Sequence, residues 1–282
     1  GYSNEATRRA IEKFQTYFAL PANGADNVYH RDAWYAQEFG PVTLIVIDSN
    51  DVEPHRSDSD TNWYLRPAAD GGIAPSWNPG SEQYRWLEQA LRSAQHRSRF
   101  TFVMLHAPPY SSGVHGLPPG FGDGEDYLSG RPLRALTPLF LRYGVDAVFS
   151  GHDELYEHAV IAGTEQRPDG AEREHRVHFI IVGIGGDGLR GPLPQLKYPE
   201  RVFSAYDDAP KVFAADGSLQ SGGMHYGHLQ VSVSADGEQG WQARIEPVYM
   251  VPLMSPEGDV REFSKQRYDD VTVIHEPAGA TK

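Results

Sequence analysis

The chain has 282 residues, with 39% hydrophobic and 11% aromatic residues spread along its length. This composition indicates a folded protein with an ample core rather than a disordered one. The formal net charge of −13 argues against nucleic acid and anionic membrane surfaces as general partners. The absence of cysteine excludes disulfides and thiolate metal sites, and no apolar run approaches the roughly 20 residues of a membrane span.

The first half of the chain alternates segments typical of helices and strands. A first helix is predicted to begin at Ser3 or Asn4 and to end near Phe18, with Ile11 and Phe14 on its apolar face. Further elements predicted in this half are strands at residues 34–35, 42–48, 100–105 and 145–149, helices at residues 80–94 and 131–143, and loops at residues 50–79 and 111–130. Alternation of this kind is typical of α/β proteins.

The second half is mostly strand-like and ends in a polar segment. Strands are predicted at residues 155–161, 177–182, 229–233 and 241–248. Residues 251–282 are polar and contain proline, so we expect them to wrap the surface as a tail. Neither an internal repeat nor a linker marks a boundary, and the sequence therefore predicts one domain over residues 1–282.

Metal-competent side chains follow two of the predicted buried strands. His106 comes directly after the strand at residues 100–105. His152 and Glu154 follow the strand at residues 145–149, and in an extended segment they point to the same side. One helical crossover joins the two strands, which makes them parallel and puts both strand ends on one edge of the sheet. Neutral imidazole and carboxylate suit zinc, iron or manganese, so the sequence predicts a metal site at this edge.

Asp48 ends the apolar strand that begins at Val42, and its position has two interpretations. Its carboxylate can be a metal ligand, because chemistry in α/β proteins lies just past the carboxyl ends of strands. The alternative, which we favour, is a strand-end carboxylate that caps a turn.

Residues 183–188 match G-x-G-x-x-G after a predicted strand, which is the fingerprint of dinucleotide binding. That fingerprint requires a following helix whose N-terminus binds the pyrophosphate. Pro192 and Pro194 follow instead and forbid such a helix, so we interpret this segment as a turn.

Two segments carry a resemblance to a known family. Residues 100–110, Phe-Thr-Phe-Val-Met-Leu-His-Ala-Pro-Pro-Tyr, and residues 145–157, which contain Gly-His-Asp-Glu, resemble the distal half of a calcineurin-like metallophosphoesterase of the purple-acid-phosphatase-like branch. The resemblance spans most of residues 30–250 and implies an α/β fold, a four-layer α/β/β/α sandwich of two mixed sheets flanked by helices. It also implies a metal-dependent phosphoric ester hydrolase with a binuclear centre and a metal-bound hydroxide.

The resemblance assigns roles residue by residue. His106 and His152 resemble ligands of the second metal, and Glu154 stands where the family motif Gly-His-x-His has a ligand of the first metal. The implied cofactors are two divalent or trivalent metal ions, iron, manganese or zinc. His115 comes nine positions after His106, where this branch has a histidine that contacts phosphate and protonates the leaving group. The alternative is that His115 is a solvent-exposed histidine of a loop with no role in the site. His158 stands where the family often has arginine, and we assign it no role.

The chain departs from the family in its early motifs. Asp-x-His and Gly-Asn-His, which supply the bridging aspartate and most ligands of the first metal, are absent from the sequence. We therefore expect the fold to be incomplete at its N-terminus, so that residues 1–282 are the C-terminal portion of the domain. A separate N-terminal segment or chain is then the expected partner that completes the site.

The remaining expectations concern the substrate, the location and the competing functions. The resemblance implies a phosphate-ester small molecule or nucleotide as substrate and an extracytoplasmic location, periplasmic or secreted. One alternative is a non-catalytic descendant of the fold that acts as a binding module. Another is a mononuclear iron oxygenase, because His152 and Glu154 with a distal histidine such as His228 imitate a facial triad.

Overall fold

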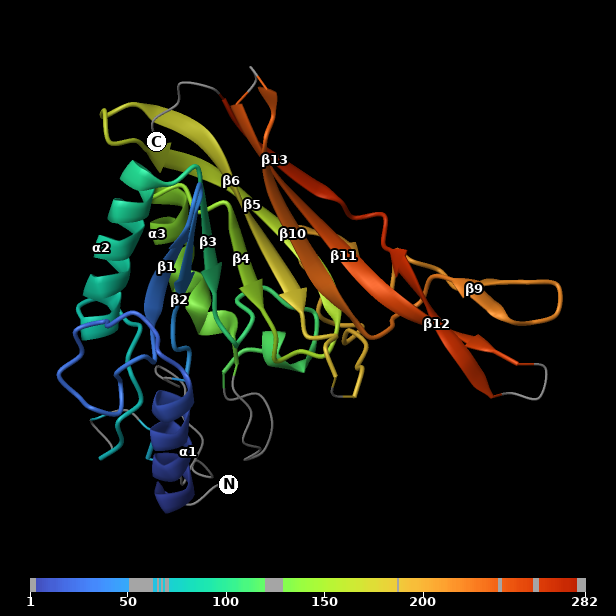
Figure 1. Cartoon of the computed structure of the whole chain (residues 1–282), viewed down its shortest axis with the longest axis horizontal. Coiled ribbons are helices and arrows are strands. Elements are labelled where there is room, and N and C mark those ends of the chain that lie inside the picture. The colour runs from blue at the N-terminus through green and yellow to red at the C-terminus, as the bar shows by residue number, and fades with distance from the viewer. Residues whose placement is uncertain are drawn as a thin grey trace.

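A mixed sheet of seven strands forms the centre of the computed structural model (Figure 1). The structure describes residues 4–50, 63, 64, 66, 68, 71–119, 129–186, 188–237, 240–255 and 259–277. The strands of the sheet are β1 (Tyr35–Phe39), β2 (Val42–Val46), β3 (Phe100–Met104), β4 (Ala147–Ser150), β5 (Tyr156–Gln166), β6 (Glu172–Val182) and β7 (Arg201–Ser204). Their order is β1-β2-β3-β4-β6-β5-β7, and the pairs β2–β3, β3–β4 and β4–β6 are parallel.

Helices cover one face of this sheet (Figure 1). They are α2 (Glu82–Arg97), the 3₁₀ helix η3 (Arg131–Leu136) and α3 (Thr137–Arg142). Leu87 and Leu91 of α2 and Phe140 of α3 are buried. They share a core with Val103 of β3 and Val148 of β4. The helix α2, and η3 together with α3, are the helical crossovers that the apolar spacing predicts.

Proline divides the helix predicted at residues 131–143. The segment begins as the 3₁₀ helix η3 and continues as α3, with Pro132 near the start of the first part and Pro138 near the start of the second. Because proline has no backbone N–H and is tolerated mainly in the first turn of a helix, Pro138 begins a new helix instead of continuing the old one.

A second sheet packs on the other face of the first. Its strands are β10 (Gly227–Ala235), β11 (Gly240–Met254), β12 (Val260–Arg267) and β13 (Thr272–Pro277), and the short hairpin β8 (Val212–Phe213) and β9 (Leu219–Ser221) lies beside it. Phe102 and Phe149 of the first sheet share a core with Ile245, Tyr249 and Val251 of the second. The α/β fold of two packed sheets with helices is therefore confirmed. The second sheet is antiparallel rather than mixed, and within the described residues no helix covers its outer face (Figure 1).

The polar segment at residues 251–282 adds strands to the second sheet where a surface tail was expected. β12 and β13 both pair with the edge of β11 that lies opposite β10. Most side chains of β12 are exposed, so this strand needs few apolar residues. The hydrophobic alternation that identifies a half-buried strand is weak there for that reason.

The first helix, α1 (Asn4–Tyr17), forms where the apolar spacing predicts it, but its apolar face is not buried. Phe14 is 41% exposed and Phe18 is 53% exposed. The side-chain amide of Gln15 attaches the helix to the carbonyl oxygens of Val28 and Arg31, at 3.0 and 2.9 Å. None of the helices within the described residues has the length and apolar character needed to cross a membrane.

Candidate active site

The parallel pairing of β3 and β4 brings two of the predicted ligands to one edge of the sheet. Met104 pairs with Phe149 at the ends of these strands, and the backbone N–H of Gly151 donates to the carbonyl of His106 at 3.0 Å. The ring centroids of His106 and His152 are 4.6 Å apart as a result. Two parallel strands joined by a helical crossover therefore bring His106 and His152 together, as the sequence predicts.

His152 adopts a left-handed backbone conformation at the tip of the turn after β4. Its φ is +66°, and Asp32 is the one further non-glycine residue of the described chain with positive φ. This conformation is costly for a residue with a side chain and persists where the surrounding structure imposes it. The segment after Gly151 is bent rather than extended, so the alternation rule that placed His152 and Glu154 on the same side does not apply to it.

His115 lies against His152 although a loop separates it from the sheet. It belongs to the 3₁₀ helix η2 (Val114–Gly116) and is only 8% exposed. The ring centroids of His115 and His152 are 3.5 Å apart, with 35° between the ring planes. The structure thus gathers His106, His115 and His152, and the burial of His115 argues against a solvated loop histidine.

The electrostatics around His106 favour a neutral ring. Desolvation by the surrounding protein lowers the pKa of His106, and the nearby imidazole of His115 lowers it further. A neutral imidazole has the lone pair that a metal ligand needs, whereas imidazolium does not. The surroundings of His106 therefore suit a metal ligand at neutral pH.

Glu154 is bound to a different part of the chain. Its carboxylate forms an ion pair with Arg190, 3.2 Å from Oε2 to Nε, and the side chain of Glu154 is 14% exposed. The backbone carbonyl of Glu154 also accepts a hydrogen bond from the N–H of Arg190 at 2.9 Å. Both contacts hold Glu154 to the segment after β6, so its role as a metal ligand stays a prediction without support from its contacts.

The side chains at this sheet edge match only part of the ligand set that the implied metals need. His106 and His152 offer two imidazoles close together, which suits part of one metal site. Across the residues that the structure describes, however, no group of three or more His, Cys, Asp or Glu side chains is arranged to hold a metal ion. The described residues therefore fit part of one metal site and do not fit a binuclear centre.

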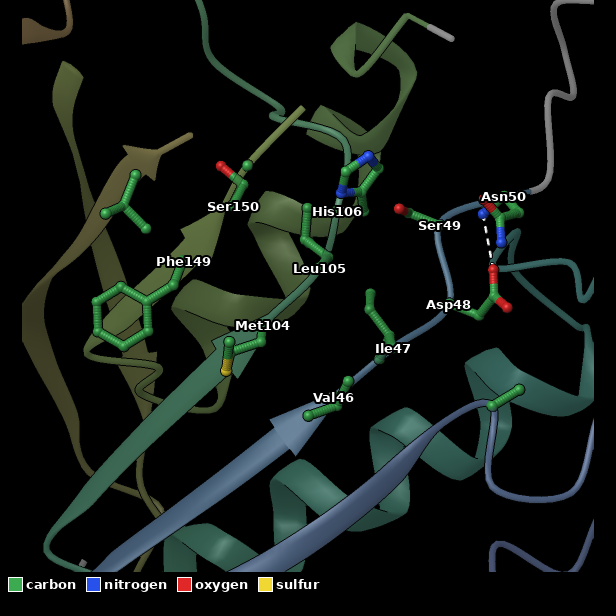
Figure 2. A pocket seen from close by; sticks show the side chains of 13 residues that line it. Val46, Ile47, Asp48, Ser49, Asn50, Met104, Leu105, His106, Phe149 and Ser150 are labelled. Atoms are coloured by element: carbon green, nitrogen blue, oxygen red, sulfur yellow. Dashed lines mark hydrogen bonds between the residues drawn. The ribbon is translucent and has the colours of Figure 1, made fainter. Parts of the chain in front are cut away.

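A pocket of about 450 Å³ opens beside His106, at the ends of β2, β3 and β4 (Figure 2). Ser49 and Asn50 line it, and the hydroxyl oxygen of Ser49 accepts a hydrogen bond from the N–H of Ala107 at 3.2 Å. Neither residue is predicted from the sequence as part of the site, although both closely follow a buried strand, where α/β proteins place their functional groups. The pocket gives a ligand access to the sheet edge that carries His106, His115 and His152, which we call the histidine edge.

Asp48 lines the same pocket but its carboxylate has partners in the turn. Oδ1 accepts the backbone N–H of Asn50 at 2.8 Å, which Figure 2 shows, and Oδ2 accepts the hydroxyl of Tyr64 at 3.0 Å. These contacts support the interpretation of Asp48 as a turn-capping residue.

Two buried carboxylates close to His152, Asp153 in the turn after β4 and Glu157 near the start of β5, were not predicted from the sequence as parts of the site. Asp153 is 2% exposed and accepts the backbone N–H of His115. Glu157 is fully buried and accepts the N–H of Ser112 at 3.0 Å. Burial raises the pKa of both carboxyl groups, and the hydrogen bonds that they accept oppose this rise.

The glycine-rich segment after β6 is a turn, as the prolines predict. β6 ends at Val182, and no helix occurs in residues 188–200. A Cβ at Gly183 would lie 1.9 Å from the carbonyl oxygen of Asp153, so close backbone approach explains the glycine here. The dinucleotide fingerprint is therefore accidental.

Comparison with known proteins agrees with this fold. The family model for calcineurin-like phosphoesterase matches residues 13–154, half of the chain. The chain belongs to the calcineurin-like phosphoesterase family, which overturns the oxygenase alternative. In keeping with this, the third residue of the supposed triad, His228, lies in β10 of the second sheet.

The curated relatives indicate the branch of the family. The chain is 28% identical to the Fe(3+)-Zn(2+) purple acid phosphatase 12 of Arabidopsis thaliana over 175 residues, which cover 55% of the chain and 34% of that protein. It is likewise 28% identical to purple acid phosphatase 1 of Ipomoea batatas, with 62% and 38% covered. The chain thus spans about a third of the length of the relatives that it matches. The structure of a purple acid phosphatase from yellow lupin seeds matches with a TM-score of 0.49 and 18% identity, covering 89% of this chain and 34% of that one.

Proposed function

We propose that the chain is part of a metal-dependent phosphoric ester hydrolase that acts on phosphomonoesters or phosphodiesters. The observation that carries the proposal is the gathering of His106, His115 and His152 at one sheet edge, beside a pocket of about 450 Å³. Membership of the phosphoesterase family and similarity to purple acid phosphatases support it. A small phosphate ester, such as an aryl phosphate or a nucleotide, is the proposed substrate.

The residues at this edge have separate proposed roles. His106 and His152 would hold one metal ion, iron, zinc or manganese, through neutral ring nitrogens. When bound, the metal supplies charge neutralisation at the phosphate and activates water. His115 contacts the phosphate and donates a proton to the leaving group, for which its place against His152 is suitable. Glu154 remains a proposed ligand of a second metal only if its ion pair with Arg190 opens.

We also propose that a further polypeptide segment completes the site. The described residues bring two imidazoles to the metal, which are too few for two ions, and the chain spans about a third of its relatives. A groove of about 710 Å³ lies between the two sheets, lined by apolar side chains that include Phe102, Phe149, Leu229, Val231 and Trp241. Within the described residues β10 pairs only with β11, so its other edge can accept a strand that also covers this groove.

An activity measurement tests the proposal. Residues 1–282 are produced alone and together with the adjoining coding sequence, and each form is assayed on an aryl phosphate with iron, zinc or manganese. We expect the extended form to hydrolyse the substrate and His115→Ala to lose roughly 10²-fold or more in kcat. His96→Ala is the matched control, because this histidine is exposed on α2.

Two outcomes would contradict the proposal. Equal activity of the short and extended forms would exclude the need for a completing segment. Absence of hydrolysis from the extended, metal-loaded form would favour a non-catalytic binding module instead. We further propose an extracytoplasmic location, which fractionation of the source cells would test.

A further inference from the structure

The carboxylate of Asp153 holds both ends of the short segment that carries His115. Its Oδ1 accepts the backbone N–H of His115 at 3.2 Å, and its Oδ2 accepts the hydroxyl of Ser111. The hydroxyl oxygen of Ser111 in turn accepts the N–H of Gly113 at 2.8 Å. Because Asp153 is 2% exposed, water does not compete for these hydrogen bonds.

Gly113 leaves the space that this carboxylate occupies. A Cβ at Gly113 would lie 2.4 Å from Cγ of Asp153 and within 2.7 Å of both carboxylate oxygens. The backbone of Gly113 has φ of −77°, a conformation that any residue adopts, so backbone strain does not explain the glycine. The close approach of Asp153 does explain it.

A second carboxylate holds the middle of the same segment. Glu157 accepts both the N–H and the hydroxyl of Ser112, and it forms an ion pair with Arg201 at 3.6 Å. These contacts attach the segment to β5 but do not reach the residue that carries the imidazole. Asp153 is the carboxylate that bonds to the backbone of His115 itself.

We infer that Asp153 is a positioning residue that fixes the imidazole of His115 against His152, an inference that rests on the proposed function. Asp153 directly follows His152 in the chain, so one short turn places both His152 and the carboxylate that orients His115. Without the carboxylate, the His115 segment keeps the Glu157 anchor but loses the contact nearest the ring. Misplacement of an acid by even about 1 Å slows a reaction considerably, which should lower kcat more than it raises KM.

The test combines hydrogen exchange at the His115 amide with steady-state kinetics on the complete, metal-loaded protein. For Asp153→Ala we expect exchange of this amide to accelerate at least about tenfold and kcat to fall roughly tenfold. Asp153→Asn should stay close to the wild type, because the amide oxygen accepts from His115 and the amide nitrogen donates to Ser111. Gly113→Ala should behave like Asp153→Ala, since its methyl group displaces the carboxylate.

A double variant and a control separate this role from general destabilisation. Gly113→Ala with Asp153→Ala should be no worse than either single variant, because the clash and the contact involve the same carboxylate. Asp146→Ala removes another buried carboxylate, one that accepts the N–H of Thr101 at 2.7 Å. It should lower the melting temperature without accelerating exchange at His115.

Unchanged exchange at the His115 amide in Asp153→Ala would overturn the inference. Equal losses in Asp153→Asn and Asp153→Ala would also overturn it, because the asparagine side-chain oxygen still accepts the N–H of His115. If the wild type hydrolyses no phosphate ester while Asp153→Ala still accelerates exchange at His115, the proposed function fails and the positioning contact stands.

Discussion

A buried chain of hydrogen bonds between the two sheets should make the protein sensitive to acid. The hydroxyl of Tyr156 donates to Asp270 at 2.6 Å, and Nδ1 of His158 lies 3.0 Å from the same carboxylate. Nε2 of His158 lies 2.9 Å from Nδ1 of His178. Burial, together with the neighbouring imidazole of His158, lowers the pKa of His178 to about 4.

The direction and the size of the change in the free energy of unfolding with pH follow from proton linkage. An unfolded histidine has a pKa of about 6.5, so between about pH 6.5 and pH 4 the unfolded chain binds a proton that folded His178 does not. The free energy of unfolding therefore falls as the pH decreases through this window. With the folded pKa at about 4, the loss reaches about 3 kcal/mol below pH 4, and His178 has no effect above the window.

Urea unfolding from pH 7 to about pH 4 measures this loss. His178→Gln keeps a polar partner for His158 but does not titrate, so its free energy of unfolding should fall by about 3 kcal/mol less than that of the wild type across the range. His96→Gln, on the exposed side of α2, should behave like the wild type. Parallel curves for His178→Gln and the wild type would refute the argument.

Two further predictions concern the scaffold. Arg173 is paired with the buried carboxylates of Glu165 and Glu276 and so links β6 to β13 of the second sheet. Arg173→Met should lower the free energy of unfolding by about 3–5 kcal/mol, because it leaves buried charge unpaired, and a loss below about 1 kcal/mol in urea unfolding would exclude this role. The hydroxyl of Ser81 caps α2 by accepting the N–H of Tyr84 at 3.1 Å. Ser81→Ala should therefore cost about 1 kcal/mol, whereas Ser81→Asp should cost little, and equal costs would contradict the assignment.

The sequence predicts the part of the site that depends on regular structure. Apolar runs and a helical crossover are enough to place β3 beside β4, and the parallel pairing then brings His106 to His152. It also predicts the helices α2 and α1, whose apolar residues repeat at helical spacing. These features arise from local periodicity and from rules that hold for all α/β proteins.

The rest of the site depends on tertiary contacts that no local pattern contains. The turn at His152 is left-handed, so counting alternate residues does not give the direction of Glu154. The position of His115 depends on a hydrogen bond to Asp153, which is 38 residues away in the chain. The polar strand β12 has mostly exposed side chains, and its sequence therefore lacks the alternation typical of a strand.

The most direct test of the central claim is the metal content of the histidine edge. The complete protein is isolated, and its iron, zinc and manganese are measured by mass spectrometry for the wild type, His106→Ala, His152→Ala and the control His96→Ala. We predict that either site variant loses about one metal ion per chain, because one metal would bind both imidazoles, while the control retains the wild-type content. Full metal occupancy in His152→Ala would contradict the claim that this edge is a metal site.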